Sequence, residues 1–148
     1  MKLANIVRIR VFVKPEENEQ EIKQALLKLL PFNLEEEKIV LERRAAQGFN
    51  ERKIIVCEIS LQKDRQINKF LEHLNQSITK SQKALLLKQA DSRLDSELNF
   101  FIRLDKQSLL QGNYLVTDSG DCFHIRISVA AFPRTKEVAM KVVNEIFR

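Results

Sequence analysis

The sequence predicts an α+β fold, a two-layer sandwich in which helices cover one face of a sheet. Residues 6–14 alternate strictly: Val7, Ile9 and Val11 point to one side, and cationic and aromatic residues lie between them, as in a half-buried strand. Other segments carry a single apolar stripe at helical spacing, and such a stripe has to pack against a second layer.

The first half of the chain is expected to form a strand, a helix and a hairpin. The helix should open at residues 15–17, because a proline followed by two acids suits a helix start. It should end at Pro31, which cannot continue a helix. Two strands, near 38–44 and 52–61, are then joined by a turn at 47–50.

The second half of the chain is also expected to contain both helices and strands. Helices are expected over 64–78 and 81–90 and from 133 onward, and strands near 99–104 and 122–131. Between these two strands, Asp105 is expected to cap one or two helical turns that Gly112 ends. Since no linker or low-complexity tract interrupts the pattern, we expect a single α/β domain over residues 1–148.

Composition excludes several classes of protein. With 44% hydrophobic and 30% charged residues, the chain is globular rather than disordered. No apolar stretch reaches the roughly 20 residues of a membrane span. The two cysteines lie far apart and suggest no disulfide framework, so we expect a reduced, cytoplasmic protein without a membrane partner. The formal net charge of +5 favours polyanionic partners.

No pattern in the sequence predicts an enzyme, a metal site or a cofactor. Three glycines leave no room for a P-loop or a dinucleotide fingerprint, and there is no nucleophile elbow or zinc-protease helix. Cys122 and His124 share one side of a strand, next to Asp121. A metal needs three or four converging ligands, however, and the sequence offers only His73 as another imidazole.

The sheet face left open by the helices is expected to be basic and aromatic, and therefore to bind RNA. Cations neutralise phosphates and release counterions, while rings and guanidinium planes stack on bases. The alternative is that these arginines only keep a solvated face soluble. The predicted contact residues, read from strand alternation, are Arg8, Arg10, Phe12 and Lys14 in the first strand, Phe101 and Arg103 in the fourth, and Arg126, beside His124, in the fifth.

Residues outside the strands are predicted to add contacts to RNA. Lys106 and Gln107 follow the fourth strand, placed for a phosphate and for a base edge or 2′-hydroxyl. Arg134 and Lys136 lie at the last helix start, where cations are unfavourable unless an anion binds; solvated charge is the alternative. The hairpin carries Phe49 at its tip and is flanked by four cations, which is typical of an RNA clasp but commoner in a solvated tip. The four cations are Arg43, Arg44, Arg52 and Lys53.

One strand does not fit an RNA-binding face. Ile54 and Val56 would point to the open side of the sheet, and an exposed apolar patch more often marks a protein interface. The alternative function is therefore a structural or assembly subunit that uses this part of the face for homodimerisation or for docking another protein.

The chain also resembles an archaeal family of RNA-binding proteins and exosome subunits. The resemblance is sharpest where strand 101–104 runs into Asp-Lys-Gln at 105–107, with Gly112 behind it, followed by 125–129 and Phe-Pro at 132–133. The alternating first strand, the helix ending in Leu-Leu-Pro and the hairpin turn agree in order. The resemblance implies a fold like that of the ribosomal L-five protein, with a curved, mostly antiparallel sheet. It also implies dimers and a role in an RNA-processing complex or in ribosome assembly.

Overall fold

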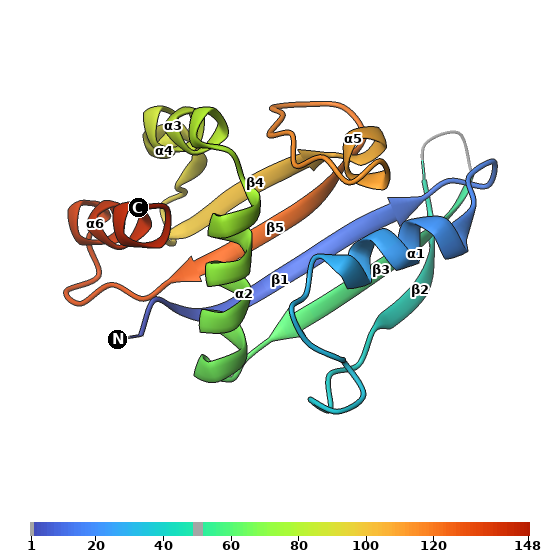
Figure 1. The fold of residues 1–148 in the computed structure, drawn as a ribbon, viewed down its shortest axis with the longest axis horizontal. Helices are drawn as coiled ribbons and strands as arrows, with labels where there is room; N and C mark the ends of the chain where they lie inside the picture. Colours follow the sequence, from blue (N-terminus) through green and yellow to red (C-terminus); the bar gives the residue numbers. More distant parts are fainter. Residues whose placement is uncertain (1, 49–51) are drawn as a thin grey trace.

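The sheet of the protein is antiparallel and has the strand order β2-β3-β1-β5-β4 (Figure 1). The computed structural model describes residues 2–48 and 52–148; Phe49, expected at the hairpin tip, lies outside these residues. β1 is the central strand and pairs with β3 on one side and β5 on the other. The strands are β1 (Ala4–Val13), β2 (Glu42–Gln47), β3 (Lys53–Leu61), β4 (Asn99–Asp105) and β5 (Cys122–Val129).

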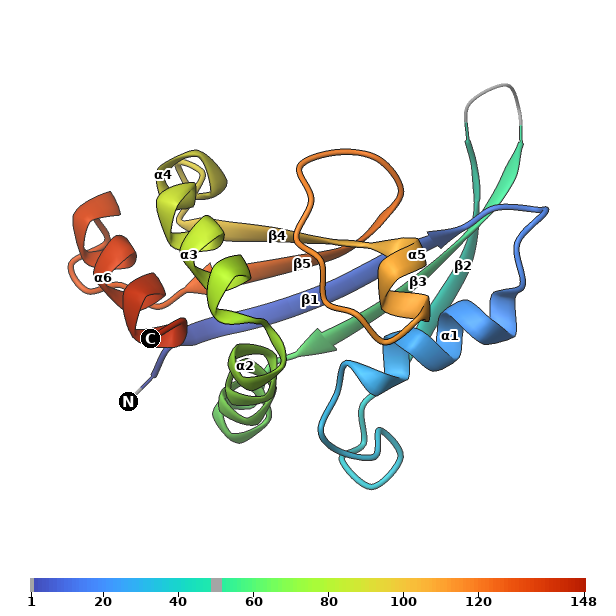
Figure 2. The ribbon, with the colours of Figure 1, turned by 45° about the horizontal axis from the view of Figure 1, so that its top comes forward.

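The helices gather over one face of this sheet, as Figures 1 and 2 show. The fold class predicted from the sequence, α+β with helices on one face of a mostly antiparallel sheet, is therefore confirmed. No helix within the described ranges is long and apolar enough to cross a bilayer. The helices are α1 (Glu19–Lys28), α2 (Asp64–Ser77), α3 (Lys80–Lys88), α4 (Ala90–Arg93), α5 (Lys106–Leu110) and α6 (Lys136–Ile146).

The core forms between the helices and the sheet face that they cover. Antiparallel register lines up one isoleucine from each of four neighbouring strands, Ile59, Ile9, Ile125 and Ile102, and each is at most 1% exposed. The apolar stripe of α2 packs on this layer through side chains such as Phe70, which is fully buried. Burying an apolar side chain of this size contributes roughly 1.5–3 kcal/mol, so these positions hold the two layers together.

Two predicted boundaries in the first half differ from the structure. α1 begins at Glu19 rather than at 15–17, because the Asn18 side chain accepts a hydrogen bond from the Glu21 amide and caps the helix there. β2 covers Glu42–Gln47 rather than 38–44. Lys38 has a φ of 57°, a left-handed conformation that ends a turn and delays the strand.

The last helix also starts later than predicted. α6 begins at Lys136, because the Thr135 hydroxyl accepts a hydrogen bond from the Val138 amide and caps the helix. Pro133 instead belongs to the turn that separates β5 from α6, after a cis peptide bond with Phe132. β5 ends at Val129, before the predicted strand end at 131.

A buried lysine joins three segments at one end of the sheet. Lys106, at the start of α5, is fully buried, and its Nζ donates to the Phe12 carbonyl at 2.7 Å. The same ammonium lies 3.0 Å from Glu17 Oε1 and 2.9 Å from Asp121 Oδ1. The three acceptors compensate the ammonium for its lost hydration, and they tie the end of β1 and the turn before α1 to the start of β5.

Removing this ammonium should destabilise the protein strongly. Lys106→Met keeps the bulk of the side chain but leaves the Glu17 and Asp121 carboxylates without their buried partner, so we expect the free energy of unfolding to fall by about 3 kcal/mol. Urea denaturation measures this. Lys14→Met is the matched control: Lys14 also pairs with Asp121, at 2.9 Å, but its side chain is 41% exposed, so the loss should stay below about 1 kcal/mol. Equal losses in the two variants would contradict the role of Lys106.

Candidate nucleic-acid interface

The sheet face opposite the helices carries two rows of side chains that strand register fixes. The structure confirms which side of β1, β4 and β5 each residue was predicted to face: the apolar residues are buried, and the residues between them face the open side. Strands lie about 4.8 Å apart, so residues paired across them are direct neighbours. In the order β3-β1-β5-β4, the rows are Ser60-Arg8-Arg126-Phe101 and Glu58-Arg10-His124-Arg103.

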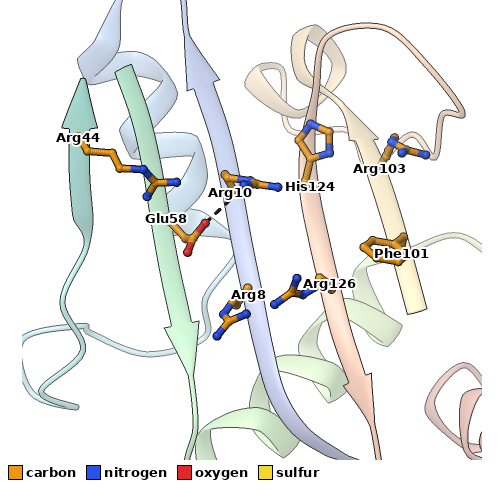
Figure 3. A pocket seen from close by; sticks show the side chains of 8 residues that line it. All are labelled: Arg8, Arg10, Arg44, Glu58, Phe101, Arg103, His124 and Arg126. Atoms are coloured by element: carbon orange, nitrogen blue, oxygen red, sulfur yellow. Dashed lines mark ion pairs between the residues drawn. The ribbon is translucent and has the colours of Figure 1, made fainter. Parts of the chain in front are cut away.

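These two rows border a hollow of about 390 Å³, which we call the basic hollow (Figure 3). Among the described residues that line it are five arginines and one glutamate, which give a formal charge of +4 with His124 neutral. Such a concentration of guanidinium groups raises the local concentration of anions at the site. The lining residues are Arg8, Arg10, Arg44, Glu58, Phe101, Arg103, His124 and Arg126.

The arginines of the basic hollow are poorly neutralised by the protein itself. Arg8 and Arg126 are directly opposite across β1 and β5, and like charges in this position destabilise a sheet. Arg10 has Glu58 at 3.9 Å, the outer limit of an ion pair. Arg8, Arg103 and Arg126 form no ion pair with any carboxylate in the described part of the chain. An anion bound between them would relieve this repulsion.

His124 lies between two of these arginines on the open face. Partial burial and the positive charges of Arg10 and Arg103, its cross-strand partners, lower the pKa of His124. The imidazole is therefore neutral near pH 7. Its ring meets the edge of Phe12 with the centroids 5.8 Å apart, and Cys122 Sγ lies 3.6 Å from Nε2.

The two aromatic residues predicted to stack on bases have different surroundings. The Arg10 guanidinium lies 5.6 Å from the ring centre of Phe12, and His124 packs against the same ring. Phe12 does not line the basic hollow. Phe101 does line it, so its ring is the one that the structure presents there.

Of the other predicted contact residues, Lys106 lies in an unexpected place. The expected exposed position of Lys106 is wrong, because Glu17, Asp121 and the Phe12 carbonyl hold its ammonium in the interior. Lys14 and Gln107 are accessible, although Lys14 pairs with Asp121.

Arg134 and Lys136 are exposed but lie apart from the basic hollow. Lys136 pairs with Asp91 at 2.9 Å, and Arg134 donates to the Glu97 carbonyl at 3.4 Å. Neither side chain lines the basic hollow. Each of these two cations thus has one partner within the chain.

The exposed apolar patch expected on β3 does not form. Val56 is only 2% exposed, because the side chains of Phe12 and Arg44, its partners on the neighbouring strands, flank it on the open face. Ile54 is half-buried beside Gly48, where an added Cβ would lie 2.1 Å from Ile54 Cδ1. The expected exposure of Val56 is therefore wrong.

Three lining residues, Arg44, Glu58 and His124, were not among the predicted contact residues. Arg44 pairs with Val56 in the β2–β3 register and so shares its face, but the predicted strand ended at Arg44 and gave no such placement. The alternation of β3 puts Glu58 on the open face, but sequence reasoning assigned it no role there. As for metals, no three residues of the types His, Cys, Asp and Glu converge within the described ranges to hold an ion.

Comparison with known proteins gives consistent matches along the chain. A family model described as RNA binding matches residues 6–129. The chain is 32% identical to RNA-binding protein PAB1135 of Pyrococcus abyssi over 142 residues, which cover 96% of this chain and 92% of that protein. It is 27% identical to the uncharacterised protein MJ0213 of Methanocaldococcus jannaschii over 148 residues, 97% and 99% of the two chains.

Solved structures share the fold over the full length. Mth689, a DUF54 protein of Methanothermobacter thermautotrophicus, is 26% identical with a TM-score of 0.80 and coverage of 99% of both chains. AF2318 from Archaeoglobus fulgidus, whose identity is 22%, has a TM-score of 0.82 and coverage of 100% of both chains. The second likeness supports the fold alone.

The lowered pKa of His124 should make stability depend on pH. The unfolded chain takes up a proton on this residue near pH 6.5, whereas the folded chain does so only at lower pH. His124 therefore favours the folded state above about pH 6.5, and this contribution is lost as the pH falls toward the lower folded pKa. We expect His124→Gln to reduce the drop in Tm between pH 7.5 and pH 5.5.

Arg103→Gln supplies a second variant for the same measurement. Since Arg103 is one cause of the lowered pKa of His124, its neutralisation should reduce the same drop in Tm, but by less than His124→Gln does. A drop in Tm that is identical in His124→Gln and the unmodified protein would contradict this account.

Proposed function

The chain belongs to this RNA-binding family, and we propose that the basic hollow and the open sheet face around it bind RNA without catalysing a reaction on it. The observation that carries the proposal is the convergence of arginines from four strands, with Arg8 and Arg126 directly opposite each other. All five arginines lie within the residues that the family model matches. Bound phosphates would supply the negative charge that the face lacks.

The open face suits a single strand better than a duplex. Bases of a single strand are free to stack on aromatic rings and guanidinium planes, whereas those of an A-form helix are covered by their neighbours. Phe101 offers such a ring beside Arg126, its partner on β5. A volume of about 390 Å³ lies within the range of pockets that hold small ligands, so one nucleotide could enter while the rest follows the sheet.

In the cell, we infer a cytoplasmic role in RNA processing or ribosome assembly. The name of the Pyrococcus relative supports RNA binding. The part in RNA processing or ribosome assembly rests on the resemblance to RNA-binding proteins and exosome subunits. Homodimerisation through Ile54 and Val56 loses its main support, because Val56 is buried within the face.

Charge reversal on the face should weaken RNA binding and its dependence on salt. We expect Arg8→Glu and Arg126→Glu each to reduce affinity for a single-stranded RNA about tenfold or more, because each removes a charged hydrogen-bond donor to phosphate. The slope of log K against log salt concentration should fall by roughly 0.7 for each lost contact. Fluorescence anisotropy with a labelled oligonucleotide, titrated at several salt concentrations, measures both quantities.

Lys88→Glu is the matched control for this experiment. Lys88 is exposed at the end of α3, on the helix side of the molecule, so the same change in net charge should alter affinity much less. Equal losses in the control and the two face variants would show that only net charge matters. Absence of RNA binding at low salt would refute the proposal.

A further inference from the structure

Glu58 is an anomaly in a face built for polyanions. It is the one carboxylate among the described residues that line the basic hollow, and it would repel a phosphate. Its side chain is 17% exposed, so most of its surface has already lost contact with water. Such a group lowers the affinity for RNA unless something in the bound RNA makes use of it.

The protein itself does not satisfy this carboxylate. Arg10 Nε lies 3.9 Å from Glu58 Oε2, which is too far for a hydrogen bond. Figure 3 shows the Arg44 side chain reaching from β2 toward the same carboxylate, yet among the described residues the 3.9 Å contact with Arg10 is the one charged contact that Glu58 makes. Neither oxygen is among the fully buried, unpartnered side-chain atoms of the described residues, so both keep contact with solvent and are free to accept a hydrogen bond from a ligand.

The arrangement of cations around Glu58 indicates which part of RNA would meet it. Arg10 is its partner on β1, while Arg8 and Arg44 lie one step away along the neighbouring strands, on opposite sides of it. Phosphates held by these arginines would lie around Glu58 rather than on it. In a nucleic-acid strand a sugar lies between two successive phosphates, so the group nearest the carboxylate would be a ribose.

An ionised carboxylate only accepts hydrogen bonds, and the 2′-hydroxyl is the donor that distinguishes ribose from deoxyribose. We propose that Glu58 accepts a hydrogen bond from a ribose 2′-hydroxyl and so makes the basic hollow select RNA over DNA. The inference rests on the proposed function, since it assigns a specificity-determining residue within the same site. DNA would meet the repulsion from Glu58 without the compensating hydrogen bond.

The test compares three oligouridylate probes of equal length and sequence. One carries ribose, one carries deoxyribose, and one carries 2′-fluororibose, which keeps an RNA-like sugar conformation but has no donor. The unmodified protein should bind the ribose probe about tenfold to a hundredfold more tightly than either of the others, the range expected for a hydrogen bond to a charged group.

Two substitutions identify Glu58 as the source of this preference. In Glu58→Ala the preference should fall to near one, and affinity for the deoxyribose probe should rise because the repulsion is removed. Glu58→Gln preserves the shape of the side chain and, as a neutral acceptor, should give an intermediate preference, so the test does not depend on the stability of the alanine variant. Glu42→Ala is the matched control, since Glu42 lies opposite Glu58 on β2 but does not line the basic hollow.

Each outcome decides between alternatives. If Glu58 only positions Arg10, its substitution will weaken all three probes by the same factor and leave the preference unchanged, which overturns the inference. Equal affinity of the unmodified protein for the three probes overturns it as well, while RNA binding itself stands. If no probe binds at low salt, the proposed function fails, and that result is distinct from a lost preference.

Discussion

β1 is hydrogen-bonded on both sides, and the register of these two pairings decides which residues of the sheet face the helices and which face solvent. Ile9 lies opposite Ile59 on β3 and Ile125 on β5, so the core row is continuous across the sheet. One residue along the chain, Arg10 lies opposite Glu58 and His124 on the other face. A slip of one residue would exchange the two faces, which would bury arginines and expose the isoleucines.

The basic hollow is costly for the free protein, and the opposite face offsets the cost. Directly opposed guanidiniums such as those of Arg8 and Arg126 repel each other across neighbouring strands. The side chains on the opposite face of the same strands, among them Ile9 and Ile125, are almost completely buried, and their burial stabilises the pairing of the strands. Lys106 adds a second constraint, because it ties the end of β1 to Glu17 and Asp121. The charged side chains of the site therefore lie on the solvent-facing side of the sheet, and the apolar side chains that hold the strands together lie on the side that the helices cover.

Much of this arrangement can be read from the sequence, because alternation is a local property. The residues of β1, β4 and β5 that face solvent follow from their parity alone, and Arg8, Arg103 and Arg126 were identified in this way. Lys106 could not be placed, because its burial depends on Glu17, 89 residues away in the chain. The residues next to a lysine that follows a strand do not indicate whether its ammonium is buried or exposed.

Val56 and Arg44 show a second limit of sequence reasoning. Alternation correctly puts Val56 on the open face, but whether it is exposed depends on the size of its neighbours on β1 and β2. The placement of Arg44 beside Val56 in turn required the correct extent of β2, which continues to Gln47, and its register with β3. Parity within a strand was thus accessible from the sequence, whereas contacts between strands required the register.

The unpaired arginines and Glu58 leave groups of opposite charge available on the same face. In the basic hollow the protein leaves cations without carboxylates at hydrogen-bonding distance, and it leaves a carboxylate to which no described residue donates a hydrogen bond. Arg10 and Glu58 are direct neighbours on β1 and β3, the position in which opposite charges pair across strands. They stay 3.9 Å apart instead, so both kinds of group remain available to a ligand. A ligand that offers alternating anions and hydroxyl donors would satisfy both, and a ribose-phosphate backbone has this alternation.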